Sequence, residues 1–196
     1  MDAIYNRRSI RKFLKKDVPP ELISSIIDAG RYAPSAKNRQ PWKFIVFGNE
    51  SKQRLLDRME CGIKREENGA AMLPNSRSGL PDARNTLKIM RKAPVIVIVL
   101  NTNGNSPFLP VNNDDRITEI CDSLSIGACI ENILLKAEEY HLGTLWIANT
   151  CFAYNELSEH LNTNDQIIGA IAVGYTDENP VQRPRKPLDA IVEYRL

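Results

Sequence analysis

The sequence predicts a single domain in which helices and strands alternate. Its 196 residues suit one domain without a long linker. Residues 95–100 form a continuous, β-branched apolar run, which is typical of a central strand buried on both faces. Apolar residues from Ile117 to Ala137 instead recur with helical spacing over about six turns. The small residues Gly127 and Ala128 in this helix indicate a central position with close backbone packing.

The remaining elements follow from the same two patterns. The Pro19-Pro20-Glu21 sequence marks the start of a helix, because proline suits the first helical position and an acidic residue favours the first turn. That helix should end near Arg31 or Tyr32, since Pro34 disfavours helix before it. We expect further helices from Ser51 and at residues 153–161, strands at residues 43–47, 144–147 and 167–175, and a possible strand at residues 190–194.

The pattern loosens between residues 60 and 92. Charged residues and the breakers Gly69, Pro74, Gly79 and Pro81 interrupt it. We therefore expect one domain over residues 1–196, with a variable and mobile excursion at about 60–115 that contains one or two short helices. This excursion is a candidate lid.

Composition narrows the possible partners. The net charge of +2 argues against non-specific nucleic-acid binding, and the longest apolar run, residues 93–100, is too short to cross a membrane. No signal segment opens the chain. The four cysteines form no C-x-x-C pair, so with two histidines we expect no metal site and reduced, mostly buried thiols in a cytoplasmic protein.

Familiar catalytic motifs are missing from the sequence. It contains neither a G-x-G-x-x-G nor a G-x-x-x-x-G-K-S/T segment, and no G-x-S-x-G elbow. His141 and His160 have no obvious serine or cysteine partner. We therefore assign no catalytic side chain.

A cluster of cations opens the chain, with Arg7, Arg8, Ser9 and Arg11 inside five positions. The guanidinium fork donates two parallel hydrogen bonds to a planar or tetrahedral anion. Whether the segment is extended or helical, at least two arginines and Ser9 can converge on one ligand. The alternative is a solvated basic N-terminus.

A second polar cluster lies between Pro34 and Pro41. Ser35, Asn38 and Gln40 are held on this constrained loop, and amide side chains present paired donors and acceptors that suit the edge of a planar heterocycle. The alternative is a simple connecting turn.

Four segments in this order and spacing resemble the FMN-dependent nitroreductase family. They are Arg7-Arg8-Ser9-Ile10-Arg11-Lys12-Phe13, Ala33-Pro34-Ser35-x-x-Asn38-x-Gln40-Pro41-Trp42, Gly143-Thr144-Leu145-Trp146-Ile147, and Gly174-Tyr175 followed by Arg183-Pro184-Arg185-Lys186-Pro187-Leu188. The resemblance implies an α+β, nitroreductase-like fold with a mixed central sheet flanked by helices. It also implies an intertwined homodimer, joined through long central helices, with two FMN molecules at the interface.

The family resemblance also assigns the residues that contact FMN. The arginines and Ser9 match positions that contact phosphate, ribityl and the pyrimidine edge, the proline-bracketed loop matches the contact to the ring, and the stretch at 145–148 matches backbone beside N5. The assigned residues are Arg7, Arg8, Ser9, Arg11, Ser35, Asn38, Gln40, Leu145, Trp146, Ala148, Arg183 and Arg185.

The implied activity is electron transfer from NADH or NADPH to a nitroaromatic, quinone or similar small oxidant, by a ping-pong mechanism with the chemistry on FMN. Two alternatives stay open. One is a specialised relative, dehalogenase-like or flavin-fragmenting, and the other is a flavin-binding or redox-sensing module without rapid turnover.

Overall fold

A four-stranded antiparallel sheet forms the centre of the molecule. The structure is a computed structural model and describes residues 3–196. The strands are β1 (Trp42–Gly48), β2 (Val95–Asn101), β3 (Leu142–Ile147) and β4 (Gln166–Tyr175), in the order β1-β2-β4-β3. Every residue of β2 is buried, which confirms it as a central strand.

The N-terminal segment extends the sheet beyond β3. Ser9 forms a parallel bridge to Thr144, and Phe13 forms an antiparallel bridge to Thr176. The backbone N–H of Ile10 donates to the carbonyl of Thr144 at 2.8 Å. The parallel bridge gives the sheet its mixed character, and it fixes the arginine-rich segment against the sheet edge.

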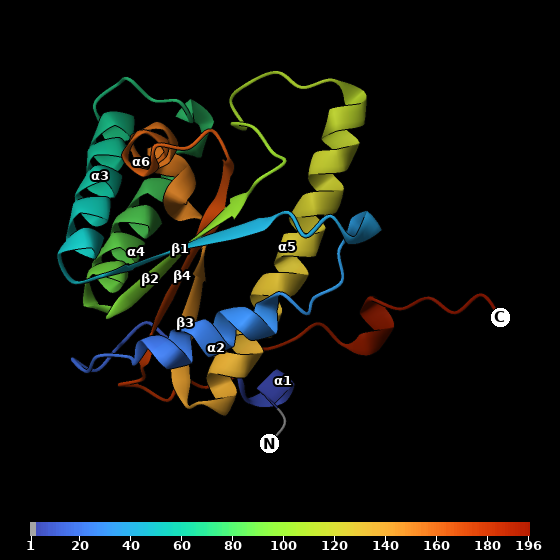
Figure 1. The fold of residues 1–196 in the computed structure, drawn as a ribbon. Helices are drawn as coiled ribbons and strands as arrows, with labels where there is room; N and C mark the ends of the chain where they lie inside the picture. The colour runs from blue at the N-terminus through green and yellow to red at the C-terminus, as the bar shows by residue number, and fades with distance from the viewer. Residues whose placement is uncertain (1–2) are drawn as a thin grey trace.

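Helices cover both faces of the sheet. Helices α2 (Pro20–Gly30) and α5 (Asn113–Glu139) pack on one face, while α3 (Asn49–Glu67), α4 (Leu80–Lys92) and α6 (Tyr154–Leu161) pack on the other (Figure 1). The chain is completed by α1 (Ala3–Asn6) and the short 3-10 turns η1 (Ala36–Asn38), η2 (Pro74–Gly79), η3 (Asn149–Ala153) and η4 (Leu188–Ala190). Alternate residues of β2 enter the two apolar cores.

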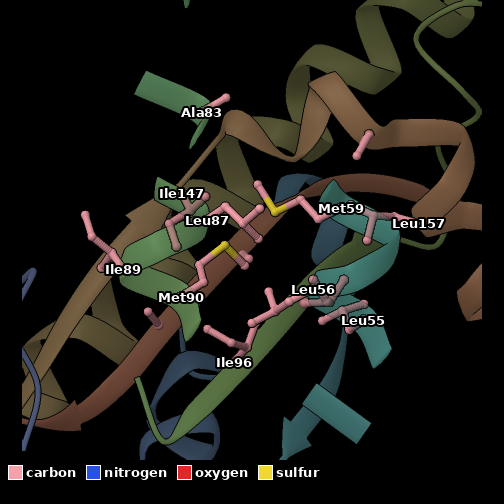
Figure 2. Packing of buried hydrophobic residues seen from close by; sticks show 14 of the residues in the cluster. Leu55, Leu56, Met59, Ala83, Leu87, Ile89, Met90, Ile96, Ile147 and Leu157 are labelled. Atoms are coloured by element: carbon pink, nitrogen blue, oxygen red, sulfur yellow. The ribbon is translucent and has the colours of Figure 1, made fainter. Parts of the chain in front are cut away.

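Region 60–115 belongs largely to the body of the protein. Leu56 and Met59 of α3 pack with Leu87 and Met90 of α4 over Ile96 of the sheet (Figure 2). The region therefore contains the end of a 19-residue helix, a 13-residue helix and the central strand. A lid stays a prediction for the segments between these elements, residues 68–79 and 102–112.

The C-terminal tail runs along the surface and away from the body (Figure 1). Residues 181–196 are all exposed, and residues 191–196 form no strand. The strand predicted at residues 190–194 is therefore wrong for the single chain. Its β-forming residues have no neighbouring strand to pair with here, and propensity alone does not hold an extended segment.

The cysteines differ in their surroundings. Cys129 is buried between α2 and α5, and burial raises the pKa of its thiol to about 12. Cys61 is exposed, and Cys121 and Cys151 are half-buried, so the expectation of mostly buried thiols holds fully for one of the four. No helix among residues 3–196 combines the length and the apolar composition that crossing a membrane requires.

Candidate functional site

The two ends of the chain meet in a pocket rich in arginine. Residues 7–9 and 11 line it together with residues 180–183 and 185. Six of the twelve residues assigned from sequence therefore lie in one pocket, which we call the cationic pocket: Arg7, Arg8, Ser9, Arg11, Arg183 and Arg185. Five guanidinium groups and a hydroxyl provide strong donors for an anion.

Two carboxylates shape the cationic pocket. Glu178 Oε1 accepts hydrogen bonds from the backbone N–H groups of Arg11 (2.5 Å) and Lys12 (3.0 Å), which binds the start of the tail to the opening segment. Glu131 of α5 lies 3.2 Å from Arg7 Nε. The tail and α5 thus hold the opening segment from two sides.

Backbone carbonyls orient two of the guanidinium groups. Arg8 Nη1 donates to the carbonyl of Tyr5 at 2.7 Å, and Arg11 Nη1 donates to the carbonyl of Ser9 at 3.1 Å. Each guanidinium has five N–H donors, so both keep donors for a ligand.

The free edge of β3 continues from the cationic pocket. Thr144 directs its carbonyl away from β4 and toward Ile10, and backbone groups two residues further along a strand point the same way. Trp146 therefore presents its backbone N–H outward, while its half-exposed side chain lies over Gly127 of α5. Leu145 points into the core, and Ala148 is exposed just beyond the strand.

The volume of the cationic pocket limits what one chain can hold. It encloses about 100 Å³, roughly the share of three water molecules. This volume suits a phosphate-sized anion, and an attached aromatic ring system would lie outside it. A larger ligand would extend beyond the pocket, and the free edge of β3 adjoins it.

The three remaining residues lie together on a second structure, the polar loop (residues 35–40). Gln40 N donates to Ser35 Oγ at 3.0 Å, and Gln40 Nε2 donates to Asn38 Oδ1 at 3.2 Å. Asn38 and Gln40 are exposed. The loop is attached to α5 through Ala36 N, which donates to Ser125 Oγ at 3.2 Å, and through an ion pair between Arg39 and Asp122.

The cationic pocket and the polar loop lie on opposite sides of α5. The loop contacts Asp122, and Arg7 contacts Glu131. These two positions are separated by about two and a half turns, so their side chains leave the helix in opposite directions. Figure 1 shows α1 near the C-terminal end of α5 and η1, the blue turn between α2 and β1, beside the middle of the helix. One chain therefore does not join the two halves of the predicted site.

Three supporting carboxylates, Glu178, Glu131 and Asp122, were not among the residues assigned from sequence. Glu178 accepts hydrogen bonds from the backbone of Arg11 and Lys12, which precede it by 167 and 166 positions. No local pattern indicates such a contact. Asp122 did carry a signal, because it lies one turn before Ile126 on the apolar stripe of the helix, where a carboxylate requires a cation or hydrogen-bond donors. Within residues 3–196 no cluster of metal-ligating side chains occurs.

Solved structures share this fold over almost their whole length. A nitroreductase-like family protein from Bacillus cereus covers 99% of the chain and 94% of its own, with 23% identity and a TM-score of 0.76. The FMN-dependent nitroreductase NfnB from Mycobacterium smegmatis, solved in complex with NADPH, covers 99% and 96%, with 18% identity and a TM-score of 0.77. At these identities the likeness shows a common fold.

The fold and the pocket define an α+β protein with an arginine-rich pocket at the edge of its sheet. A family model described as the Nitroreductase family matches residues 4–175, and the chain belongs to that family. A nitrobenzene nitroreductase from Ectopseudomonas oleovorans is 41% identical over 200 residues, which cover 91% of this chain and 87% of that protein.

Proposed function

We propose that this protein is an FMN-dependent oxidoreductase that passes electrons from NADH or NADPH to a nitroaromatic, a quinone or a similar small oxidant. The observation that carries the proposal is the cationic pocket, in which the chain's two ends bring five arginines and Ser9 together beside an open strand edge. The names of relatives support the same activity: NfnB is FMN-dependent and was solved with NADPH, and another relative reduces nitrobenzene by name.

The chain's own residues suit FMN in a definite order. Arg11, Arg183 and Arg185, with Arg7 and Arg8, are donors for a phosphate of about two negative charges. From Thr144 to Ala148 the β3 edge runs about 13 Å, which gives an extended ligand a path away from the pocket. The outward backbone N–H of Trp146 is a donor for the ring edge. Bound FMN supplies the electron-transfer chemistry, and the protein binds it and sets its electrostatics.

The polar loop enters this proposal through a second copy of the chain. Ile117, Ile120 and Leu124 form an exposed apolar stripe along α5, with Leu124 70% exposed. The stripe lies on the side of α5 that contacts Arg7, because Leu124 is about two turns before Glu131, and this side is opposite Asp122 and the polar loop. A partner chain packed on this stripe in a two-fold dimer would lie beside the cationic pocket, where its own polar loop could complete the site. We therefore propose a homodimer with shared flavin sites.

The acceptor and the kinetic order follow from the same chemistry. One flavin face that serves donor and acceptor in turn predicts ping-pong kinetics, with the nicotinamide product leaving before the oxidant binds. The 41% identity to a nitrobenzene nitroreductase makes a nitroarene the acceptor to test first. Four free cysteines are consistent with the cytoplasmic location that we propose.

The visible spectrum of the purified protein tests the proposal directly. We expect a flavin absorption band that NADPH or NADH bleaches without air and that nitrobenzene restores. Steady-state rates at several donor concentrations should give parallel double-reciprocal lines. A protein that shows no flavin band after incubation with FMN would contradict the assignment. Stable FMN binding without turnover would instead indicate a flavin-binding module.

A further inference from the structure

The polar loop has a backbone that its own sequence does not favour. Lys37, Asn38 and Gln40 have φ values of 54°, 54° and 48°, in the left-handed region where a Cβ approaches the following carbonyl. Asparagine tolerates this region, but lysine and glutamine do so at a cost. Three such residues within four positions keep one shape only if the surroundings hold them.

An ion pair between Arg39 and a buried carboxylate holds the loop at its centre. Arg39 Nε donates to Asp122 Oδ1 at 2.8 Å, and Arg39 Nη2 lies 2.7 Å from the same oxygen. The side chain of Asp122 is 1% exposed. A carboxylate at that depth needs its cation, because water cannot replace it. Arg39 is thus fixed in position, and its neighbours Asn38 and Gln40 are fixed with it.

The other oxygen of Asp122 connects the loop to the sheet. Asn103 Nδ2 donates to Asp122 Oδ2 at 3.2 Å, and Asn103 N donates to Asn101 Oδ1 at 3.1 Å. Asn101 is fully buried at the end of β2, and its Nδ2 donates to Gln166 Oε1 of β4 at 3.1 Å. Asp122 therefore links a strained surface loop to the two central strands.

We propose that Asp122 is a positioning residue for the flavin ring. It contacts no ligand, and it acts through Arg39 by holding the amides of Asn38 and Gln40 in the geometry in which they meet the ring edge. This inference rests on the proposed FMN site. It goes beyond that site because it gives a ligand-binding role to a buried carboxylate that lies outside both the cationic pocket and the polar loop.

The test compares Asp122→Asn with Asp165→Asn in the full-length protein. Asp165 pairs with Lys43 at 3.2 Å in a partly exposed ion pair between a strand and a loop, so the control makes the same chemical change away from the polar loop. The first measurement needs no flavin. Trypsin cuts after exposed Lys37 only when the loop opens, and mass spectrometry of the apoprotein follows that single cleavage.

We expect Asp122→Asn to speed cleavage after Lys37 by about fivefold, because proteolysis follows the population of the open loop. FMN affinity, measured by flavin fluorescence, should fall about tenfold, as expected when a supporting residue misplaces a binding group. Riboflavin, which keeps the ring and lacks the phosphate, should lose affinity by the same factor. The Asp165→Asn protein should match wild type in all three measurements.

A pair of further variants covers the case in which Asp122→Asn does not fold. Arg39→Gln removes the partner from the loop side, and Arg39→Gln with Asp122→Asn leaves no unpaired buried charge. If the two residues act as a unit, the double variant resembles the worse single variant.

Two outcomes would overturn the inference. One is wild-type cleavage after Lys37 in a folded Asp122 variant, and the other is faster cleavage with unchanged affinity for both FMN and riboflavin. Failure of the wild-type protein to bind any flavin would instead refute the proposed function, while the trypsin measurement would still report whether Asp122 holds the loop.

Discussion

The cationic pocket and the polar loop show two ways to build half of a binding site. The pocket gathers long arginine side chains from segments about 170 positions apart, held by backbone bridges and the carboxylates of Glu178 and Glu131. The loop places Ser35, Asn38 and Gln40 within six consecutive residues, and an ion pair to the buried carboxylate of Asp122 holds its strained backbone. An anion attracts cations from a range of directions, whereas the edge of a planar ring requires donors at fixed angles. Under the proposed FMN assignment, the difference in construction matches this difference in ligand chemistry.

The largest effect should come from separating the two halves. Leu124→Glu puts a charge on the exposed stripe of α5, and we expect a monomer whose FMN affinity falls by about 100-fold or more, because neither half-site then completes the other. Light scattering and fluorescence titration measure both properties. Asn85→Glu adds the same charge to an exposed position of α4 and should change neither. A monomer that binds FMN like wild type would refute the shared site.

The second-largest effect on FMN affinity should come from a change within the cationic pocket alone. Arg11→Ala removes one charged donor, and a charge-assisted hydrogen bond contributes about 1.5–3 kcal/mol, so FMN should bind about 10- to 150-fold more weakly. Lys15→Ala removes a cation from the same segment but outside the pocket, and it should leave the affinity within about twofold of wild type, as for an ordinary exposed charge. Equal losses in the two variants would remove the special role of the opening segment.

The sequence alone was sufficient for the parts that local pattern determines. The β-branched run that became β2 and the apolar repeat that became α5 each carry their own evidence, and the structure confirms both. The arginines of the cationic pocket were identified through their motifs, although their meeting depends on contacts between the ends of the chain. Residues 190–194 failed as a strand because pairing, which propensity does not supply, is what stabilises one.

Asp122 and Glu178 show what a linear pattern leaves out. Each carboxylate has partners far away in sequence. Asp122 accepts hydrogen bonds from Arg39 and Asn103, and Glu178 accepts them from the backbone of residues 11 and 12. Their positions become meaningful only when the fold has brought those partners to them. Supporting residues of a binding site are for this reason harder to predict than the residues that touch the ligand.

The pH dependence of binding should separate the two halves without mutation. Guanidinium groups stay charged wherever the protein is folded, whereas a phosphate monoester has a second pKa of about 6. Below that pH the phosphate loses charge, so FMN affinity should fall by up to about tenfold between pH 7.5 and 5. Riboflavin binds through the ring alone, and its affinity should stay flat. Parallel pH curves for the two flavins would show that the phosphate does not govern binding.

The smallest effect concerns the strain in the polar loop. Lys37 has an exposed side chain and a φ of 54°, where a non-glycine residue costs about 1–2 kcal/mol. Lys37→Gly removes this cost but adds chain entropy to the unfolded state, so we expect a net gain of about 0.5 kcal/mol in the free energy of unfolding. Urea denaturation measures the gain. Lys37→Ala removes the same charge and keeps the strain, so it should give no gain in the free energy of unfolding.

FMN affinity should change little in either Lys37 variant, because the ion pair of Arg39 and Asp122 holds the loop whether or not residue 37 is relaxed. Weaker FMN binding in the glycine variant alone would show that the strained backbone at Lys37 itself, and not the ion pair, sets the geometry of the loop.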